Sequence, residues 1–290
     1  MISGDTKLTG VFGYPVKHSL SPAMHNAAFK YAGLNYVYVP YEVKPENLKT
    51  AIKSLPYLNI CGVNLTIPHK EKVLLYLDEI SKEARFIGAV NTVKVIGKKL
   101  VGYNTDISGF LMSLKKDAKI NPKDKNIVVL GAGGAAKAVC FAFVLSKAKN
   151  ITIVNRTLVR AKKLALVLNN ISRTDVSSVS KIEFCSLDSK ELKEAIAKAD
   201  ILVNTTSVGL KSEEKPVIDC SLIHSNMLVY DLIYNPSGTQ LLSESKKRGA
   251  QVMNGLGMLL YQGAISWQIW TGKKAPVNVM RQALLNRYNE

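Results

Sequence analysis

Short apolar runs alternate with amphipathic stretches along the first eighty residues. The apolar runs predict strands at residues 9–13, 36–41 and 61–66, and the stretches between them predict helices at 22–31, 45–54 and 68–77. Strands that alternate with helices usually pair in parallel, because each helix carries the chain back across the sheet. The first part of the chain is therefore predicted to be an α/β domain with a mainly parallel sheet.

The pattern changes between residues 89 and 106. Two strand-like runs, 89–96 and 99–105, flank Gly97-Lys98, which predicts a β-hairpin with a two-residue turn. In that register Asn91 lies opposite Asn104, and Asp106 is a diagonal neighbour of Asn91 on the same face. A three-residue turn would break this parity.

A second series of strands and helices follows a predicted helix at 109–115 and a polar break at 121–124. It predicts strands at 127–130, 151–155, 201–204 and 228–231, with helices that begin near Gly134, Leu158 and Leu192. Residues 255–290 are predicted to be helical, and Pro276 begins the last helix. The fold class predicted is two α/β domains, the second of them of the Rossmann type.

Length and composition agree with this prediction. The chain has 290 residues, about twice a typical domain length, and 47% of them are hydrophobic. The longest apolar run, Ala138 to Leu145, is far shorter than the roughly 18 to 20 residues that span a bilayer. The first residues lack the apolar core of a signal peptide. We therefore expect a soluble protein of the cytoplasm.

The chain is strongly basic, with 39 Lys and Arg against 22 Asp and Glu and a net charge of +17. A nucleic-acid partner, a solvated lysine-rich surface and attraction of small anions would each explain this excess. The lysines are spread in short pairs without interleaved aromatic residues, which disfavours a nucleic-acid partner. The four cysteines lie far apart, and no cluster of His, Cys and Asp predicts a metal site.

A glycine-rich turn directly follows the predicted strand at 127–130. Its sequence, Gly131-Ala132-Gly133-Gly134-Ala135-Ala136, satisfies the G-x-G-x-x-G/A pattern between a strand and a helix. Gly131 permits the tight turn and Gly133 lets the backbone approach a pyrophosphate, while the helix N-terminus supplies free N–H groups. The turn predicts dinucleotide binding; a tight turn without a ligand is the alternative.

The end of the next strand distinguishes between the two nicotinamide dinucleotides. An NAD enzyme usually carries Asp or Glu there, which accepts a hydrogen bond from the ribose 2′-hydroxyl. This chain has Asn155-Arg156-Thr157, followed by Arg160. Two guanidinium groups and a hydroxyl suit a 2′-phosphate, so NADP is favoured over NAD.

Two hydroxyl residues, Ser19 and Ser21, precede the predicted helix at 22–31. One interpretation makes Ser21 the helix N-cap and Pro22 the first helical residue. The other interpretation gives both hydroxyls to a carboxylate ligand at the helix N-terminus. The second interpretation alone assigns a role to Ser19.

Further polar residues lie at the end of the predicted strand 61–66. Asn64 and Thr66 share one face of the strand, and Lys70 follows in the first turn of the next helix, where ligands of α/β proteins bind. Together with Asn91 and Asp106 they would form a site for a polyhydroxy acid. Lys70 is the candidate proton donor, and the adjacent His69 is the alternative.

A series of motifs, in the same order across nearly the whole chain, resembles the shikimate dehydrogenase family. The motifs are Ser-Leu-Ser-Pro at 19–22, Asn-Leu-Thr-Ile-Pro-His-Lys at 64–70, Gly-Ala-Val-Asn-Thr at 88–92, Asn-Thr-Asp at 104–106, Gly-Ala-Gly-Gly-Ala at 131–135, Asn-Arg-Thr at 155–157, Asn-Thr-Thr-Ser-Val-Gly at 204–209, Asp-Leu-Ile-Tyr-Asn-Pro at 231–236 and Gly-Leu-Gly-Met-Leu-Leu-Tyr-Gln-Gly at 255–263. The resemblance implies reversible, NADPH-dependent reduction of 3-dehydroshikimate to shikimate in aromatic amino-acid biosynthesis.

The resemblance also implies roles for individual residues. Lys70 and Asp106 would be the catalytic pair and would contact the substrate, whose carboxylate and hydroxyls would be held by Ser19, Ser21, Asn64, Thr66, Asn91, Tyr234 and Gln262. NADP would be bound by Gly131, Ala132, Gly133, Gly134, Ala135, Asn155, Arg156, Thr157 and Arg160, with Leu232 and Gly255 beside the nicotinamide.

The family's organisation implies that the C-terminal helices return to the first domain. The substrate-binding catalytic domain would then comprise residues 1–108 and 255–290, the NADP-binding domain 109–254, and the cleft between them the active site. Two alternatives stay open, a quinate/shikimate dehydrogenase of broader specificity and a non-catalytic NADP-binding regulator on the same fold. We expect a monomer or homodimer that binds no metal, nucleic acid or membrane.

Overall fold

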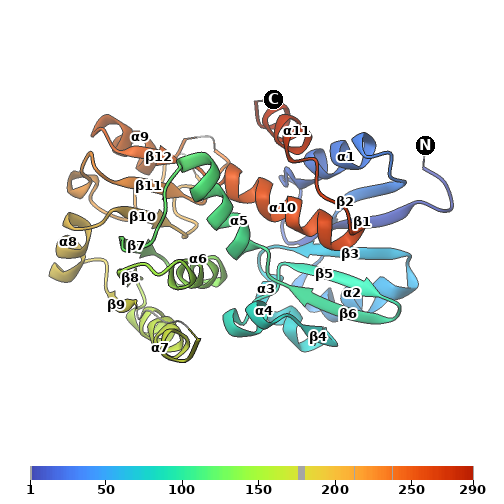
Figure 1. Ribbon diagram of the computed structural model, residues 1–290, viewed down its shortest axis with the longest axis horizontal. Helices are drawn as coiled ribbons and strands as arrows, with labels where there is room; N and C mark the ends of the chain where they lie inside the picture. The colour runs from blue at the N-terminus through green and yellow to red at the C-terminus, as the bar shows by residue number, and fades with distance from the viewer. Residues whose placement is uncertain (1, 176–179, 212, 237, 290) are drawn as a thin grey trace. The chain divides into compact units, whose positions relative to one another are not determined.

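The computed structural model describes residues 2–175, 180–211, 213–236 and 238–289 (Figure 1). The chain divides into two compact units, which are described separately. Unit 1 consists of Met1–Gly109 and Leu259–Glu290, and unit 2 of Phe110–Met258. The boundaries between the units fall inside two continuous helices, α5 (Asp106–Ser113) and α10 (Leu256–Thr271); the family resemblance implied boundaries before residues 109 and 255.

Unit 1 is built on a six-stranded mixed sheet. In spatial order its strands are β2 (Tyr36–Glu42), β1 (Lys7–Gly13), β3 (Ile60–Leu65), β5 (Thr92–Ile96), β6 (Lys99–Tyr103) and β4 (Glu79–Ile80). The β1–β2, β1–β3 and β4–β6 pairs are parallel, whereas β5 runs antiparallel to both β3 and β6. The predicted mainly parallel sheet is therefore interrupted only by the hairpin.

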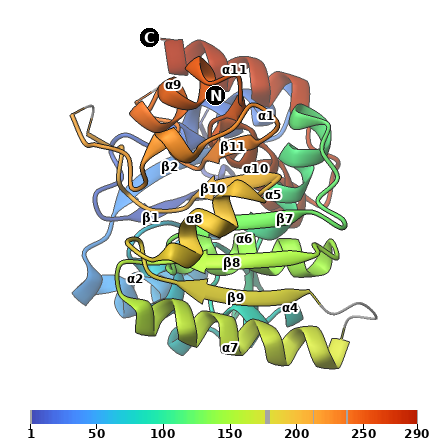
Figure 2. The same ribbon diagram turned by 90° about the vertical axis from the view of Figure 1, so that its left-hand side faces the viewer.

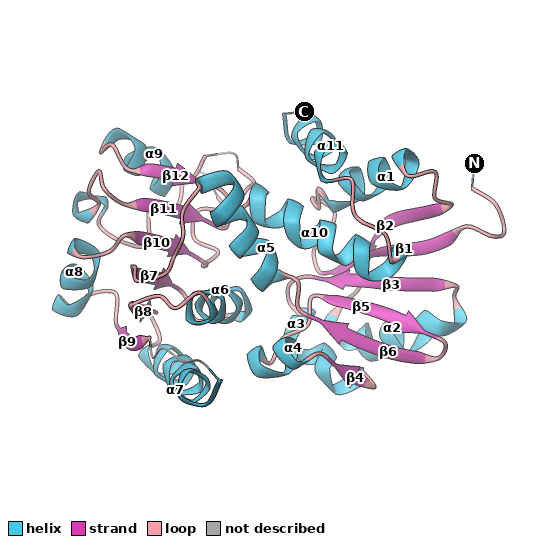
Figure 3. Cartoon of the chain, viewed as in Figure 1, coloured by secondary structure: helices cyan, strands magenta, loops and turns pink. Residues whose placement is uncertain are grey.

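Helices cover both faces of this sheet (Figure 3). They are α1 (Ser21–Tyr31), α2 (Leu48–Ser54), α3 (His69–Lys72), α4 (Lys82–Ile87), the second part of α10 and α11 (Val277–Asn289). On one face, Leu48 and Ile52 of α2 join Val63 and Val93 in a buried apolar cluster. On the other face, the indole Nε1 of Trp270 in α10 donates to the Val93 carbonyl at 3.0 Å.

The predicted hairpin is confirmed by its register. Thr92 pairs with Tyr103 and Ile96 with Lys99, so the turn contains two residues. The predicted diagonal across the hairpin is wrong in its detail, because the strand ends at Tyr103 and Asp106 is the first residue of α5. The turn into α5 nevertheless brings Asp106 to Asn91.

Unit 2 is built on a six-stranded sheet in which all strands are parallel (Figure 2). In spatial order they are β12 (Gln251–Met253), β11 (Leu228–Asp231), β10 (Ile201–Asn204), β7 (Asn126–Leu130), β8 (Asn150–Val154) and β9 (Lys181–Cys185). This order is that of the Rossmann fold. Its helices are α6 (Gly134–Leu145), α7 (Leu158–Asp175), α8 (Lys190–Ala197) and α9 (Gln240–Lys247).

Three predicted helices differ from the observed elements. Residues 45–54 contain a 3₁₀ turn at Pro45–Asn47, and α2 begins only at Leu48. Residues 68–77 contain a short helix, α3, and a 3₁₀ turn at Val73–Tyr76 instead of one continuous helix. The predicted helix at 109–115 begins earlier, as α5, and continues into a π-helical turn at Leu114–Ala118. Across the part of the chain that the structure describes, no helix has the length and apolar character needed to span a membrane.

Candidate active site

A lysine–carboxylate pair stands at the end of β3 in unit 1. Lys70 is the second residue of α3, and its Nζ lies 2.6 Å from the Oδ2 atom of Asp106 at the start of α5. The side chain of Asp106 is 6% exposed, whereas that of Lys70 is 22% exposed. The ammonium group is therefore held by a buried carboxylate while it keeps access to solvent.

Asp106 is fixed by neighbours other than Lys70. The side-chain amide of Asn91 donates to its second oxygen, Oδ1, at 2.8 Å. The backbone N–H of Asp106 donates to Asn104 Oδ1 at 3.1 Å, which closes a local turn before α5. Because both carboxylate oxygens and the backbone are engaged, the carboxylate has one orientation toward Lys70.

Asn64 is the centre of a second set of hydrogen bonds on β3. Its Oδ1 accepts from the hydroxyl of Tyr38 at 2.8 Å, and its Nδ2 donates to Thr92 Oγ1 and Ser266 Oγ, each at 3.0 Å. The same Nδ2 also donates to the backbone carbonyl of Asn91 at 3.1 Å. Asn64 is therefore joined directly to the residue that holds Asp106.

Thr105 and Gln262 connect these two sets. Thr105 N–H donates to Asn91 Oδ1 at 2.8 Å, and Gln262 Oε1 lies 3.4 Å from both Asn91 Nδ2 and Thr105 Oγ1. The sequence arguments did not single out four members of the network, Tyr38, Thr92, Thr105 and Ser266. Local signals existed for three of them: Thr92 and Thr105 lie inside the motifs that carry the family resemblance, and Ser266 follows Gln262 by four residues and so shares its helix face.

Thr66 directly follows β3, Ser19 lies in the connection between β1 and α1, and Ser21 begins α1. The backbone N–H of Thr66 donates to Phe12 O at 3.0 Å, which places the segments that follow the two strands side by side. Ser21 is the first residue of α1 and its side chain makes no capping bond, so the prediction of an N-cap is wrong. Instead, the Ser21 N–H donates to Ser19 Oγ at 3.3 Å.

His69, the alternative proton donor, faces away from Lys70. Its ring is 1% exposed, and Nε2 lies 2.7 Å from the Val43 carbonyl. Burial lowers the pKa of His69, partly offset by the bond to Val43. Because Nε2 is engaged by a buried backbone carbonyl, the geometry favours Lys70 over His69 as the proton donor.

The glycine-rich turn of unit 2 has the geometry of a phosphate site. Gly131 has φ +112°, which favours glycine, and its N–H donates to Val154 O at 2.7 Å. Gly133 precedes α6 and Gly134 begins it, and a Cβ on either would meet no atom within 4 Å. The start of α6, beside Ala132 and Ala135, is thus open for a pyrophosphate.

The segment after β8 lies at the same edge of the sheet, because β7 and β8 pair in parallel with Leu130 opposite Val154. Asn155 is half-buried and donates to the Thr157 carbonyl at 2.9 Å. Arg156 and Arg160 are exposed, and among the described residues neither guanidinium lies within salt-bridge distance of a carboxylate. Both are available to a 2′-phosphate, so these residues fit NADP.

The loops after β11 and after β12 carry three further candidates. The N–H of Gly255 donates to Ile233 O at 3.2 Å, and a Cβ at Gly255 would lie 2.0 Å from the Leu232 carbonyl. Tyr234 follows Leu232 in the loop after β11, and burial raises the pKa of its hydroxyl. Tyr234 belongs to unit 2, whereas the other predicted substrate residues belong to unit 1.

A buried carboxylate anchors this loop. Asp231 is fully buried; its Oδ1 accepts from Asn204 Nδ2 at 3.0 Å and its Oδ2 accepts from Thr239 Oγ1 at 2.7 Å. Burial raises the pKa of Asp231, and the three donors, which include the Ile233 N–H, oppose that rise. The ends of β10 and β11 and the start of α9 are thereby tied together.

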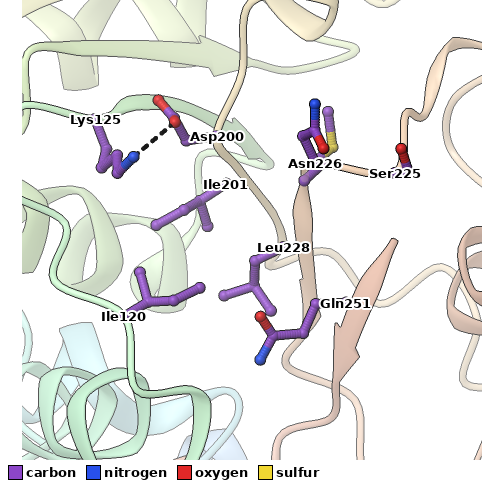
Figure 4. A pocket seen from close by; sticks show the side chains of 9 residues that line it. Ile120, Lys125, Asp200, Ile201, Ser225, Asn226, Leu228 and Gln251 are labelled. Carbon is purple, nitrogen blue, oxygen red and sulfur yellow. Dashed lines mark hydrogen bonds and ion pairs between the residues drawn. The ribbon is translucent and has the colours of Figure 1, made fainter. Parts of the chain in front are cut away.

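A cavity of about 200 Å³ lies elsewhere in unit 2, at the amino ends of the strands (Figure 4). Ile120, Ile201 and Leu228 form its apolar part, and Lys125 and Asp200 pair at its edge at 3.0 Å. Dinucleotides bind Rossmann sheets at the carboxyl ends, so this cavity is not the predicted cofactor site. In the described ranges, no three His, Cys, Asp or Glu residues are grouped as metal ligands.

The chain combines a Rossmann unit, whose phosphate turn is open, with a solvent-accessible lysine that a buried carboxylate holds. These two features are those of a dinucleotide-dependent oxidoreductase. Comparison with known proteins identifies the family. Models of the shikimate dehydrogenase substrate binding domain, of shikimate/quinate 5-dehydrogenase and of the shikimate 5′-dehydrogenase C-terminal domain match residues 11–93, 113–228 and 255–285. The chain belongs to the shikimate dehydrogenase family.

Individual relatives match over nearly their whole length. The chain is 44% identical to the NADP⁺-dependent shikimate dehydrogenase of Methanopyrus kandleri, over 98% of this chain and 97% of that protein. A crystal structure of a shikimate dehydrogenase in complex with NADP⁺ is 45% identical, with a TM-score of 0.91 over 100% of this chain and 98% of that one. The Thermus thermophilus enzyme in complex with NADP(H) and shikimate is 37% identical, with a TM-score of 0.86 over 97% and 99%.

Proposed function

We propose that this protein catalyses the reversible, NADPH-dependent reduction of 3-dehydroshikimate to shikimate; its relatives carry the name shikimate dehydrogenase (NADP⁺). The observation that carries the proposal is the Lys70–Asp106 pair, in which an accessible ammonium group is held at 2.6 Å by a buried carboxylate. A regulator that only binds NADP would have no use for such a proton donor.

The reduction needs one hydride and one proton. When bound, NADPH supplies the hydride to the C3 carbonyl carbon. Lys70 donates a hydrogen bond to the carbonyl oxygen, stabilises the negative charge that develops there, and transfers its proton to form the hydroxyl. Neutral Lys70 then recovers a proton from water, which its partial exposure allows. In the reverse direction Lys70 accepts the proton.

Asp106 keeps Lys70 in place and accepts a hydrogen bond from a substrate hydroxyl. Polar groups of unit 1 surround the pair, and we assign to them the rest of the substrate. The hydroxyls of Ser19 and Ser21 suit the carboxylate, and the remaining contacts fall to Asn64, Thr66, Asn91, Gln262 and, from unit 2, Tyr234. These assignments rest on residue chemistry and on the family resemblance.

The function is tested by mixing the protein with shikimate and either NADP⁺ or NAD⁺ and following the absorbance of the reduced nicotinamide. We expect rapid reduction of NADP⁺ and much slower reduction of NAD⁺. If a protein that binds NADPH reduces neither dinucleotide, the regulator becomes the better assignment. Quinate in place of shikimate tests the broader specificity in the same assay.

The Arg156→Ala variant is expected to raise the KM for NADP⁺ by about 10- to 100-fold, because charge-assisted hydrogen bonds to the 2′-phosphate contribute about 1.5–3 kcal/mol. The KM for NAD⁺, which lacks that phosphate, should change less than about twofold. Steady-state kinetics with both dinucleotides measure this difference.

Lys198→Ala is the matched control. It also removes one exposed positive charge from unit 2, but at the end of α8 and the amino edge of the sheet. Its KM for NADP⁺ should equal that of the unchanged protein. Equal losses for NADP⁺ and NAD⁺ in Arg156→Ala would exclude the 2′-phosphate assignment.

We further propose that the protein acts in the cytoplasm as a monomer or homodimer and without nucleic acid. The dispersed lysines support the absence of a nucleic-acid partner, because no run of them is interleaved with aromatic residues. Light scattering at micromolar concentration measures the oligomeric state, and a shift of the scattering mass on addition of RNA would contradict the proposal.

A further inference from the structure

Tyr38 is a buried hydroxyl that the reaction described above does not use. It lies in the middle of β2, is 1% exposed, and its ring stacks on His25 with centroids 4.3 Å apart and planes 8° apart. Trp270 lies against the same ring at 5.9 Å. The ring is therefore held firmly, and its hydroxyl is directed at Asn64 Oδ1, 2.8 Å away.

The two ends of the Asn64 amide have different partners. Nδ2 has three acceptors, Asn91 O, Thr92 Oγ1 and Ser266 Oγ, between 3.0 and 3.1 Å. Oδ1 has one donor among the described residues, the Tyr38 hydroxyl. A rotated amide would bring Oδ1 against the Asn91 carbonyl, where two acceptors would oppose each other. The orientation of Asn64 thus depends on Tyr38 and on the Asn91 backbone together.

The position of Asn91 links this orientation to the reacting groups. Its carbonyl accepts from Asn64, and its side-chain amide donates to Asp106 Oδ1 at 2.8 Å. Asp106 in turn holds Lys70. A chain of buried hydrogen bonds therefore runs from Tyr38 through Asn64 and Asn91 to the proposed catalytic pair, and all its members belong to unit 1.

We propose that Tyr38 is a positioning residue for the shikimate site. Its hydroxyl fixes the Asn64 amide in the orientation that holds the Asn91 backbone, and Asn64 and Asn91 are thereby placed to contact the substrate hydroxyls. The proposal rests on the proposed function. Tyr38 contacts neither of the reacting groups, so it acts through Asn64 and affects substrate binding more than the proton transfer itself.

The Tyr38→Phe variant tests this by removing one oxygen and keeping the ring stack. We expect the KM for shikimate to rise about tenfold, because the buried Asn64 oxygen loses its donor, while kcat changes less than about threefold and the KM for NADP⁺ is unchanged. Ser266→Ala should raise the KM for shikimate less, because it removes one of three acceptors rather than the single donor.

Tyr36→Phe is the matched control. Tyr36 lies two residues earlier on β2, on the same face, and stacks on Phe29 at 5.0 Å with its hydroxyl near Lys7 and Cys61. The chemical change is identical, but this hydroxyl does not reach Asn64. Its kinetic constants should match those of the unchanged protein.

A double-mutant cycle with Asn64→Ala decides whether Tyr38 acts through Asn64. On the Asn64→Ala background, Tyr38→Phe should change the KM for shikimate by less than about twofold. An undiminished tenfold effect on that background would overturn the proposal, as would an equal rise in the KM for NADP⁺. Activity of the unchanged protein with shikimate is measured first, so failure of the proposed function is seen separately.

Discussion

The Lys70→Ala variant is expected to lower kcat by a factor on the order of 10² to 10⁴, the range for loss of a general acid. The KM for shikimate should change much less, because the carboxylate and hydroxyl contacts of the substrate are left in place. The physical reason is the position of the ammonium group, 2.6 Å from Asp106 and partly exposed. The adjacent His69 does not replace it, because its Nε2 is engaged by the Val43 carbonyl.

Steady-state rates in both directions measure the effect, and Lys72→Ala is the matched control. Lys72 lies in the same short helix, is exposed, and its Nζ reaches only the Pro45 carbonyl at 3.5 Å. It should retain full activity. An unchanged kcat in Lys70→Ala would show that Lys70 does not take part in the chemistry. Thermal unfolding of the variant is measured as well, to test that the protein still folds when Asp106 has lost its partner.

The second large effect is expected on stability. In the Gly62→Ala variant, the new methyl group would lie 2.3 Å from Val93 O and 2.4 Å from Trp270 Nε1, the two atoms that form the hydrogen bond between α10 and the sheet. Overpacking costs about 1–3 kcal/mol, and loss of a buried hydrogen bond costs about 1–3 kcal/mol. We therefore expect the free energy of unfolding of unit 1 to fall by roughly 2–6 kcal/mol, a large part of the ~5–15 kcal/mol typical of proteins.

Tryptophan fluorescence during urea unfolding measures this change in unit 1 directly. The chain has two tryptophans, Trp267 and Trp270, and both lie in the part of α10 that belongs to unit 1. Gly4→Ala is the control, because a Cβ at Gly4 meets no atom within 4 Å. If Gly62→Ala has the same urea midpoint as Gly4→Ala, the structure around Val93 accommodates the new methyl group with no loss in the free energy of unfolding, and the prediction is wrong.

The strands in the interior of the sheets were predictable from sequence because they are short, apolar and bounded by turn residues. β10 and β11 begin and end at the predicted residues, and β7 and β8 begin one residue earlier than predicted. The edge strands β4, β9 and β12 were missed. Their side chains are partly exposed, and their pairing depends on a neighbouring strand rather than on an apolar pattern of their own.

The candidate site was predictable only where its residues are close in sequence. The hairpin register predicted that Asn91 lies near Asp106, although Asp106 reaches Asn91 through a turn into α5 and not as part of a strand. The bond between Asn64 and Ser266 joins residues 202 positions apart. No local pattern specifies it, because it depends on the order of the strands and on the return of α10 to unit 1.

This return of the chain has a consequence for synthesis on the ribosome. Unit 2 is one continuous stretch, so all its strands have been made once residue 258 is reached. Unit 1 lacks α10 and α11, including Trp270 and Ser266, until these helices have also been made after unit 2. During translation the first-made part of unit 1 must therefore wait with one face of its sheet only partly covered, by α1, while the complete sequence of unit 2 is already available to fold.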